Sequence, residues 1–592
     1  MNDITDTDAR AAEREKQMQQ AEEILGSLPQ ESGVAKGLFT GEFVADWVFP
    51  YPQLTDEQSR DVEAAVEGLK QFCDEHLDPE KIDREADIPR DVIDGLARIG
   101  VLGMTAPREL GGQGFSQLGY GKILEEIGGR CSSTAIFVNA HHSIGMRALL
   151  LFGTEEQKTK WLPDLISGRK LGAFALTEPE AGSDAANVQT TATPSADGTQ
   201  YTLNGQKRYI TNGSIADVLT VMARTPDPKK PEGAVSAFLV TPDMPGFQIT
   251  EARMDKLGLR GTATARLAFE NMVVPKENIL GPPGKGLKVA LTVLDFGRTT
   301  FGACCTGAAK TALRLAVDHA KTRRQFGRTL SEFELVQEKL GRMAAWTYAM
   351  EAMTTVTAGL IDRGLEDYML ETAMLKVWST ERLWTIVNDS FQIHGGAAYF
   401  TDRPLERMLR DHRLNQIGEG ANEVLVSFIA LTGMRGPGLK LKSVHDVLTK
   451  PWSGVGTLAG FAADQVRGRM QTPDVPVRSA QLVPHARQLG RLIRRLGNSV
   501  QKLLIRYRED VVDRQLEQQR IAWAAMELFA SACVLSRWDH DLSTRSGANG
   551  ADSSSAAQWF LSDSLGQAER HLDELHSSRD AALLDTARNA LK

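Results

Sequence analysis

The sequence predicts a mainly α-helical protein with a small β domain near the middle of the chain. Apolar residues recur at helical spacing over residues 54–170, and they alternate with polar residues in parts of 201–269. Helical spacing returns after Gly284 and continues beyond Leu441 to the end of the chain. Helix and strand patterns are therefore separated along the chain, which favours a helical bundle over a doubly wound sheet.

Capping signals place the helices of the N-terminal part. Residues 54–77 have a helical pattern, and the sequence TDEQ at 55–58 is a capping box that satisfies the first free backbone N–H groups. The sequence TEEQ at 154–157 repeats this signal before a helix that we expect to end near Gly168. An N-terminal helical domain is therefore predicted.

Turn residues and alternation mark the β domain. Two short apolar stretches, 201–203 and 209–211, flank the pair Asn204-Gly205, which predicts a hairpin with its turn at this pair. Further strands are expected at 234–240 and 263–269. The sequence GPPG at 281–284 marks the end of the domain.

A long apolar-faced helix is expected over residues 287–322, and a Ser/Gly-rich stretch at 543–555 is expected to interrupt the C-terminal helices. These signals divide the chain into five segments: a flexible N-terminal segment (1–40), an N-terminal helical domain (41–172), a β domain (173–283), a helical bundle (284–440) and a C-terminal helical domain (441–592).

The composition is that of a folded, water-soluble protein. The chain has 592 residues, of which 42% are hydrophobic and 24% charged, so disordered, collagen-like and disulfide-scaffold classes are excluded. A formal net charge of -8 argues against a general nucleic-acid binder. The first forty residues have neither a signal-peptide core nor the character of a transit peptide, and no apolar run is long enough to span a bilayer. We therefore expect a cytoplasmic protein.

The cysteines and histidines do not show metal-ligand spacing. Five cysteines without a CxxC motif suit a reducing compartment, and we expect buried thiols and no metal. The adjacent pair His141 and His142 points in different directions, and no carboxylate or cysteine completes a ligand set with them or with His394. We interpret all three as pocket or core residues, and Met343 and Trp346, at helical spacing, as core.

One carboxylate stands out in residues 416–423 (QIGEGANE). Glu419 lies between two glycines just before an apolar run, and a carboxyl group in a tight, poorly solvated turn has its pKa raised. Such a group suits a base that removes a weakly acidic C–H proton. The alternative is an ordinary helix-start turn, in which Glu423 only favours the helix dipole.

A second candidate is the loop 176–184 (LTEPEAGSD), which follows a predicted strand. Glycine lets a backbone approach a planar ring or a phosphate, and Ser or Thr hydroxyls can bond to flavin carbonyls and nitrogens. The alternative is a simple turn.

Together these segments resemble the acyl-CoA dehydrogenase family. The family pattern contains LTEPxAGSD, NGxKxxITNG, RxxFG and EGxxE, which occur here in the same order at 176–184, 204–213, 323–327 and 419–423. Residues 48–52, 316–320 and 336–340 resemble the very-long-chain subgroup, which also carries an extra C-terminal helical domain. The resemblance implies an N-terminal helical domain, a β-barrel-like middle domain, a helical bundle and that extra domain.

The resemblance also implies the reaction. Glu419 corresponds to the base that takes the α-proton of a long-chain fatty acyl-CoA while a hydride leaves the β-carbon for FAD, giving a trans-2-enoyl-CoA. The Glu419 backbone N–H and a ribityl hydroxyl would polarise the thioester carbonyl. Arg298 corresponds to a residue that orders base and substrate, with a buried structural ion pair as the alternative. The substrate-binding residues implied are Ser183, Asp295, Arg298, Gly418, Glu419 and Gly420.

Cofactor residues follow from the same motifs. Thr177 and Thr211 would bond to the flavin ring, with Thr211 nearest N5, and Gly182 and Ser183 would lie near the phosphates or the thioester. Arg323 would reach the pyrophosphate of a partner subunit's FAD, or in the alternative it would simply end a helix favourably. The cofactor-binding residues implied are Phe174, Leu176, Thr177, Gly182, Ser183, Tyr209, Thr211, Arg323, Phe326, Gln392, Gly395, Gly396, Ala421 and Glu423. A shared cofactor implies at least a homodimer.

The sequence departs from the family pattern at three positions. Ala421 replaces a threonine, which removes one side-chain bond to FAD, and Glu334 replaces a glutamine. Gly418 replaces a bulkier aromatic residue of shorter-chain members, which would widen the cavity beside the base.

Partners are implied in the same way. The electron acceptor would be electron-transferring flavoprotein; the alternatives are an oxidase or flavin monooxygenase on the same fold, or an assembly protein with residual activity. The segment that begins at Trp452 and ends at Arg469 has an apolar face followed by basic residues, which suits peripheral contact with an anionic membrane on its inner face. The leucine-rich basic helix at 487–503 is expected to pack in a bundle instead.

Overall fold

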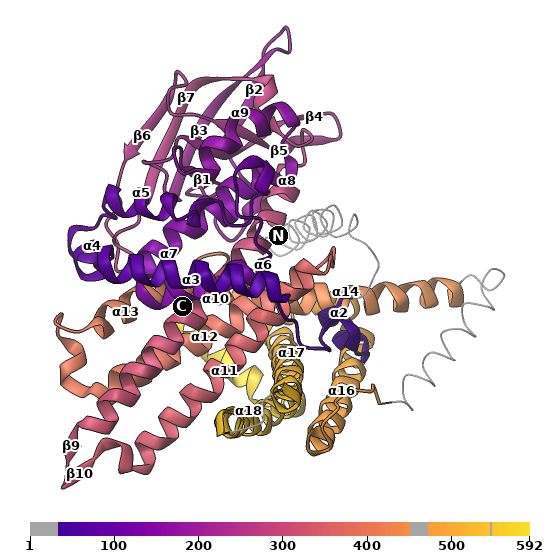
Figure 1. Cartoon of the computed structure of the whole chain (residues 1–592). Coiled ribbons are helices and arrows are strands. Elements are labelled where there is room, and N and C mark those ends of the chain that lie inside the picture. Colours follow the sequence, from indigo (N-terminus) through magenta and orange to yellow (C-terminus); the bar gives the residue numbers. More distant parts are fainter. Residues whose placement is uncertain (1–32, 450–471, 545–547) are drawn as a thin grey trace. The chain divides into compact units, whose positions relative to one another are not determined.

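The computed structural model describes residues 33–449, 472–544 and 548–592, and it contains two compact units (Figure 1). Among the described residues, one unit is Glu57–Phe301, and the other combines residues 33–56 with Gly302–Lys592 apart from the two gaps. The long helix predicted over 287–322 is confirmed as α10 (Gly286–Thr322), although its residues up to Phe301 belong to the first unit and its remaining residues to the second. The segment from Trp452 to Arg469, predicted to contact a membrane, lies outside the described residues.

Helices precede the sheet in the first unit, and both predicted helices are confirmed. At Thr154 the capping box forms: its hydroxyl accepts from the Gln157 N–H at 3.2 Å, and the Gln157 side chain accepts from the Thr154 N–H at 3.0 Å. The helices are α3 (Asp56–His76), α4 (Pro79–Glu85), α5 (Arg90–Arg98), α6 (Gln117–Arg130), α7 (Ser132–Val138), the π-helix η4 (Asn139–Met146), α8 (Arg147–Phe152) and α9 (Glu155–Ile166).

The β domain is one curled sheet of eight strands. Its order is β6-β7-β3-β2-β4-β5-β8, and β1 pairs with β4 in parallel, whereas most neighbours are antiparallel. The strands are β1 (Gly172–Ala175), β2 (Thr191–Pro194), β3 (Gln200–Ile210), β4 (Val218–Asp227), β5 (Lys230–Val240), β6 (Phe247–Glu251), β7 (Ala265–Pro275) and β8 (Ile279–Leu280). Residues on β4 alternate between two cores, so both faces of the sheet are buried.

The predicted hairpin at Asn204-Gly205 is wrong, because both residues lie inside the single strand β3. The ladder between β3 and β7 shifts register between Leu203 and Gly205, which is a bulge. Asn204 supports the bulge through its side chain, which accepts from the Asn271 N–H at 2.8 Å. A Cβ on Gly205 would lie 2.7 Å from Cα of Thr190, so the glycine permits a close backbone approach rather than a turn.

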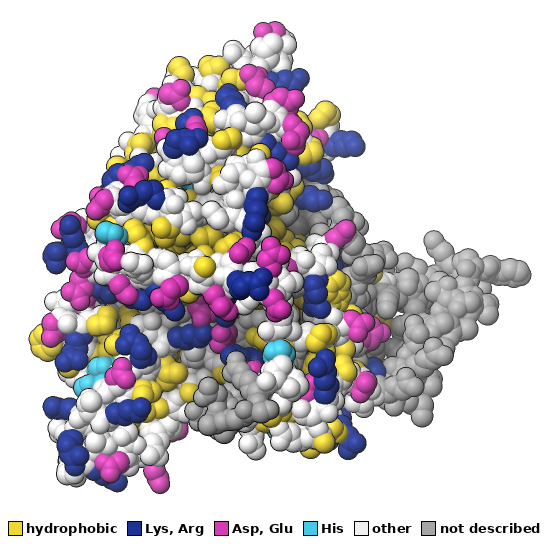
Figure 2. Space-filling view, viewed as in Figure 1, with side chains coloured by type: hydrophobic (Ala, Val, Ile, Leu, Met, Phe, Trp, Pro, Cys, Tyr) yellow, Lys and Arg dark blue, Asp and Glu magenta, His cyan; other side chains and the backbone are white. Residues whose placement is uncertain are grey.

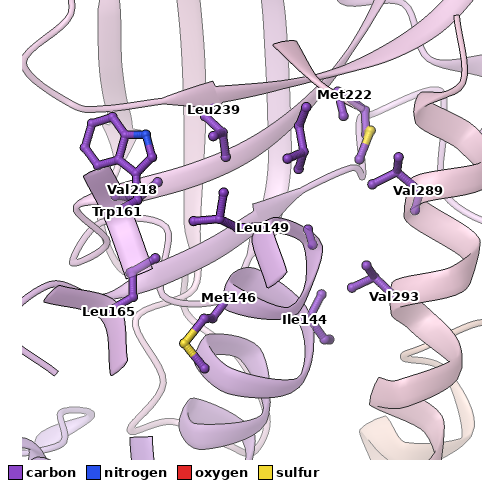
Figure 3. Packing of buried hydrophobic residues seen from close by; sticks show 14 of the residues in the cluster. Ile144, Met146, Leu149, Trp161, Leu165, Val218, Met222, Leu239, Val289 and Val293 are labelled. Atoms are coloured by element: carbon purple, nitrogen blue, oxygen red, sulfur yellow. The ribbon is translucent and has the colours of Figure 1, made fainter. Parts of the chain in front are cut away.

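A hydrophobic core joins helices to one face of this sheet (Figure 3). Leu149 and Leu165 come from α8 and α9, Val218 and Leu239 from β4 and β5, and Val293 from α10. Phe174 of β1 packs against this core and Leu176, directly after β1, belongs to it, so the loop that follows starts from a rigid base. The second core, on the opposite face, is built from the strands of the sheet and the loops between them, as in a barrel.

The second unit is almost entirely helical. Within it, α11 and α12 lie side by side and α17 packs against α11, α14 and α18. Its elements are α2 (Val34–Thr40), the hairpin strands β9 (Arg324–Gln325) and β10 (Arg328–Thr329), α11 (Glu334–Asp362), α12 (Met369–His394), α13 (Pro404–Arg413), the short helix η9 (Leu414–Gln416), α14 (Asn422–Thr449), α16 (Val483–Tyr507), α17 (Gln515–Thr544), α18 (Ala548–Asp573) and α19 (Arg579–Ala590).

The C-terminal helices form the predicted extra bundle. Leu489, Leu492, Leu496 and Leu503 of α16 are buried, as expected for a packed helix, and Met343 and Trp346 of α11 are core residues. All five cysteines are free and buried. On the face drawn in Figure 2, basic side chains lie among acidic ones.

One helical run among the described residues, Ser132–Phe152, is long and apolar enough by composition to cross a membrane. Because 78% of its most apolar window is buried, we interpret it as a core helix of the first unit.

Candidate active site

The loop around Glu419 has an unusual backbone. It connects η9 to α14, and Glu419 and Gly420 have positive φ angles of 59° and 98°. A left-handed conformation costs a residue other than glycine on the order of 1–3 kcal/mol, so the surroundings must hold it. Glu419 is half-buried, and its Oε2 oxygen is shielded from solvent. A shielded carboxylate in a strained turn is the arrangement expected of a base.

Lys376 of α12 holds the residues that follow Glu419. Its side chain is fully buried, and its ammonium donates to the carbonyl oxygen of Gly420 at 2.7 Å and to Oδ1 of Asn422 at 2.8 Å. These bonds give the buried ammonium two amide oxygens as acceptors, which offsets part of the free-energy cost of its burial.

Glu381 of α12 contacts both sides of the same loop. Its carboxylate accepts from Nε2 of Gln416 at 2.8 Å and from Nδ2 of Asn422 at 2.7 Å. The Asn422 amide also donates to the Thr380 hydroxyl at 3.0 Å. Lys376 and Glu381 could not be predicted from the sequence, since a helical lysine and glutamate about 40 residues before the loop carry no local signal.

The candidate flavin residues of the first unit lie at the ends of β1 and β3. The Arg208 N–H donates to the Thr177 carbonyl oxygen at 2.9 Å, which brings Thr177 next to Tyr209. Tyr209 has a positive φ of 62° and is 55% exposed, while Thr211 and Phe174 are half-buried and Leu176 is buried. The structure therefore brings these predicted residues onto one partly exposed strip, in which Tyr209 is exposed and Leu176 is buried.

A buried ion pair supports this strip. The Lys207 ammonium lies 2.6 Å from a carboxylate oxygen of Glu178 and donates to the Leu176 carbonyl oxygen at 3.1 Å. Burial lowers the pKa of Lys207 to about 8, although the charge of Glu178 opposes this. Burial alone would raise the pKa of Glu178, but Lys207 and bonds from Thr190 and Gln189 hold it below its usual value. Both residues lie inside the recognised motifs, yet the sequence did not indicate that they pair.

The loop after Leu176 is open at its tip. Backbone bonds between Glu178 and Ala181 close a tight turn, and Gly182 and Ser183 are exposed. A Cβ on Gly182 would meet nothing within 4 Å, so the backbone here is accessible to a ligand. This openness fits the predicted approach of a phosphate or thioester.

Arg298 is engaged within its own helix. Its guanidinium donates to Asp295 at 3.0 Å, and both side chains are buried. This contact is the structural ion pair that the alternative interpretation expects. Its role in ordering the base and the substrate stays a prediction.

The candidate dinucleotide residues of the second unit lie on exposed backbone. Arg323 follows α10 and is exposed, and Phe326 in the β9–β10 hairpin is 93% exposed with a positive φ of 51°. Gln392, Gly395 and Gly396 are exposed around the end of α12, and a Cβ on either glycine would meet nothing within 4 Å. An exposed arginine, an aromatic ring and bare glycine backbone fit a dinucleotide, although their roles stay predictions.

The remaining predicted positions have plain surroundings. Glu423 lies in the first turn of α14 and is exposed, Ala421 and Gly418 are half-buried, and Glu334 is exposed at the start of α11. A Cβ on Gly418 would make only ordinary contacts, so there is room beside the base.

The histidines are structural. His141 Nδ1 accepts from the Gly172 N–H at 2.9 Å, and its Nε2–H donates to the Leu165 carbonyl oxygen. Burial lowers the pKa of His141 to about 4, although the bond to Leu165 opposes this shift. His142 is buried beside Thr105, and His394 stacks on His319 at 4.3 Å. Within the described ranges, no group of three His, Cys, Asp or Glu residues could hold a metal ion.

Four family descriptions match the chain in sequence order. The N-terminal, middle and C-terminal domains of acyl-CoA dehydrogenase match residues 59–169, 173–272 and 284–433. The ACAD9/ACADV C-terminal domain matches residues 480–590. The matches follow the predicted order of a helical domain, a β domain, a helical bundle and an extra C-terminal domain.

Individual relatives agree with these matches. The human mitochondrial very long-chain specific acyl-CoA dehydrogenase is 37% identical over 519 residues, which cover 86% of this chain and 79% of that protein. A probable acyl-CoA dehydrogenase of Mycobacterium bovis is 34% identical over 98% of this chain and 92% of its own length. The crystal structure of the Bacillus anthracis acyl-CoA dehydrogenase complexed with FAD has a TM-score of 0.77 at 28% identity, covering 92% of each chain.

Proposed function

Because this chain belongs to the acyl-CoA dehydrogenase family, we propose that it converts long- or very-long-chain fatty acyl-CoA to trans-2-enoyl-CoA with Glu419 as base. The observation that carries the proposal is the strained, shielded Glu419 loop at the position of the family's EGxxE motif. The chain-length preference is supported by the very-long-chain relatives and by the matched ACAD9/ACADV C-terminal domain.

In this reaction the α C–H bond breaks and its proton moves to the Glu419 carboxylate. The β-hydrogen leaves with its electron pair, and the electrons of the broken α C–H bond form the new double bond. FAD, when bound, supplies the two-electron acceptor for that hydride. The backbone N–H of Glu419 would bond to the thioester oxygen, which favours loss of the α-proton by stabilising the developing negative charge.

The proposed cofactor site uses this partly exposed strip of the first unit for the flavin ring. Thr177 and Thr211 supply hydroxyl groups, and Tyr209 supplies an exposed aromatic face. In the second unit, Arg323 offers a guanidinium to a pyrophosphate and Phe326 an aromatic surface. Following the family pattern, these last residues would serve the FAD of a partner subunit, so the proposed assembly is at least a homodimer.

The proposed acceptor is electron-transferring flavoprotein, and the proposed location is the cytoplasm, with peripheral contact to the inner face of the membrane. Sedimentation with anionic vesicles tests the membrane part. Deleting the segment from Trp452 to Arg469 should abolish binding, and unchanged binding would overturn this part of the proposal.

Anaerobic titration with acyl-CoAs of graded length tests the reaction. The purified protein should be yellow, bleach with long-chain substrates and pass electrons to electron-transferring flavoprotein rather than release peroxide. Glu419→Gln should keep FAD and bind substrate but lose flavin reduction. Retained reduction in this variant would show that another residue is the base, and peroxide release without an added acceptor would indicate an oxidase.

A further inference from the structure

We propose that Lys376 and Glu381 are positioning residues that hold the Glu419 carboxylate in the orientation required to take the α-proton. This inference rests on the proposed role of Glu419. The two side chains both come from α12 and make four hydrogen bonds to residues on both sides of the base. No motif of the family resemblance stated above includes either residue.

The backbone of the loop requires such support. Two successive residues, Glu419 and Gly420, have positive φ angles, and a half-exposed loop would relax from this conformation if nothing held it. Lys376 binds the Gly420 carbonyl, which fixes the peptide plane between Gly420 and Ala421, one residue beyond Glu419. Holding this plane restrains the backbone angles of Gly420 and, through them, the backbone that carries the Glu419 side chain.

Asn422 couples the two positioning residues. Its Oδ1 accepts from Lys376 while its Nδ2 donates to Glu381, so both ends of one amide group are fixed. Asn422 is also the first residue of α14, and it is buried. The start of that helix is therefore held against α12, and Gln416 ties the other side of the loop to the same Glu381 carboxylate.

Helix α12 is itself anchored to the C-terminal helix α17. Trp378 and Arg382 both donate to the buried carboxylate of Glu527 in α17. The helix that carries Lys376 and Glu381 thus cannot turn without breaking a second buried network. A rigid support of this kind is what precise placement of a base needs.

Two variants test the inference in the full-length, FAD-loaded protein. Glu381→Gln keeps the shape of the side chain but replaces one carboxylate oxygen with an NH2 group and removes the charge. The variant therefore cannot accept charge-assisted hydrogen bonds from both Gln416 and Asn422. Lys376→Met removes the donor to Gly420 and Asn422 while keeping a linear side chain. The substrate probe is palmitoyl-CoA, and the rate constant of flavin reduction is measured by anaerobic stopped flow, together with the Kd from its saturation.

A spectroscopic probe isolates the proton transfer. A 3-thiaacyl-CoA analogue can lose its α-proton to the base, but it does not go on to transfer a hydride. The resulting enolate gives a long-wavelength charge-transfer band with oxidised FAD. A misplaced base should weaken this band while the analogue still binds.

Glu406→Gln is the matched control. Glu406 is also a partly buried helical carboxylate that accepts two bonds, at 2.8 and 3.0 Å, both from Arg410 on the same helix α13. No contact described for Glu406 involves the loop that carries Glu419. Glu419→Gln runs in parallel as the reference for loss of the base.

We expect Lys376→Met and Glu381→Gln to keep FAD and a nearly unchanged Kd while flavin reduction slows by about tenfold or more, with a weaker charge-transfer band. Rates equal to wild type, or an equal loss in Glu406→Gln, would overturn the inference. If Lys376→Met loses FAD, Glu381→Gln alone decides. Retained reduction in Glu419→Gln would instead refute the proposed base, whatever the other variants do.

Discussion

The ammonium of Lys207 lies 2.6 Å from the carboxylate of Glu178, so one fully buried ion pair joins two motifs that are 29 residues apart. Lys207 lies in β3 just before Tyr209, and Glu178 lies in the loop that follows Thr177. The pair therefore holds together the two segments that would carry the flavin ring. Its loss should affect both stability and cofactor binding.

Lys207→Met should lower the free energy of unfolding by about 3–5 kcal/mol, because it leaves the Glu178 carboxylate buried without its cation. FAD affinity should fall as well, since the two loops would no longer be tied. Chemical denaturation and flavin release measure the two effects. The double variant Lys207→Met with Glu178→Gln should recover part of the stability, and no recovery would mean that Lys207 acts through packing alone.

Gly205→Ala should destabilise the β domain by about 1–3 kcal/mol, since an added Cβ would lie 2.7 Å from the Thr190 Cα and the strands would have to move apart. Thermal unfolding measures the loss. Gly182→Ala is the control, because a Cβ there meets nothing within 4 Å, and its stability should match wild type. Equal stability of the two variants would contradict the close approach seen at Gly205.

The bulge at Gly205 also shows where the sequence misleads. An Asn-Gly pair between apolar stretches predicts a hairpin from local signals, but the glycine is required by Thr190, a residue on another segment. Local signals did predict α3, α9 and α10, since caps and apolar period are properties of the helix itself. Glu419 could be proposed as the base because its motif is also local in the sequence. The contacts of Lys376 and Glu381, by contrast, exist only when α12 packs beside the loop that carries Glu419.

Glu371 should make the stability of the second unit depend on pH. It is buried in α12 and accepts from the Ala35 N–H at 2.8 Å, and burial raises its pKa from 4.5 to about 7. Between pH 4.5 and pH 7, the Glu371 carboxyl group is therefore protonated in the folded protein and deprotonated in the unfolded chain. This contribution to stability is present below pH 4.5 and is lost as the pH rises to 7, by at most about 3 kcal/mol.

The test compares wild type with Glu371→Gln from pH 5 to pH 8 by chemical denaturation. The variant keeps an acceptor for Ala35 and has no proton to lose, so its stability relative to wild type should increase as the pH rises. A constant difference between the two proteins across this range would show that Glu371 does not change its protonation on unfolding there.

Arg382 connects α12 to the C-terminal bundle, and its removal should be costly. Its guanidinium pairs with the buried Glu527 carboxylate and lies over the ring of Trp346 at 4.6 Å and that of Trp378 at 5.2 Å. Arg382→Met should lower the free energy of unfolding by about 3–5 kcal/mol, because it leaves Glu527 buried without its cation. Chemical denaturation measures this loss.

Arg382→Lys separates charge from shape at the same position. It keeps a cation for Glu527 but loses the planar group that stacks on the tryptophans, so its stability should fall between those of wild type and Arg382→Met. If the loss of this anchor displaces α12 and with it the loop of Glu419, flavin reduction should also be slower in both variants, and slowest in the less stable Arg382→Met. Full activity in a clearly destabilised Arg382→Met would show that the C-terminal bundle stabilises the fold without positioning the base.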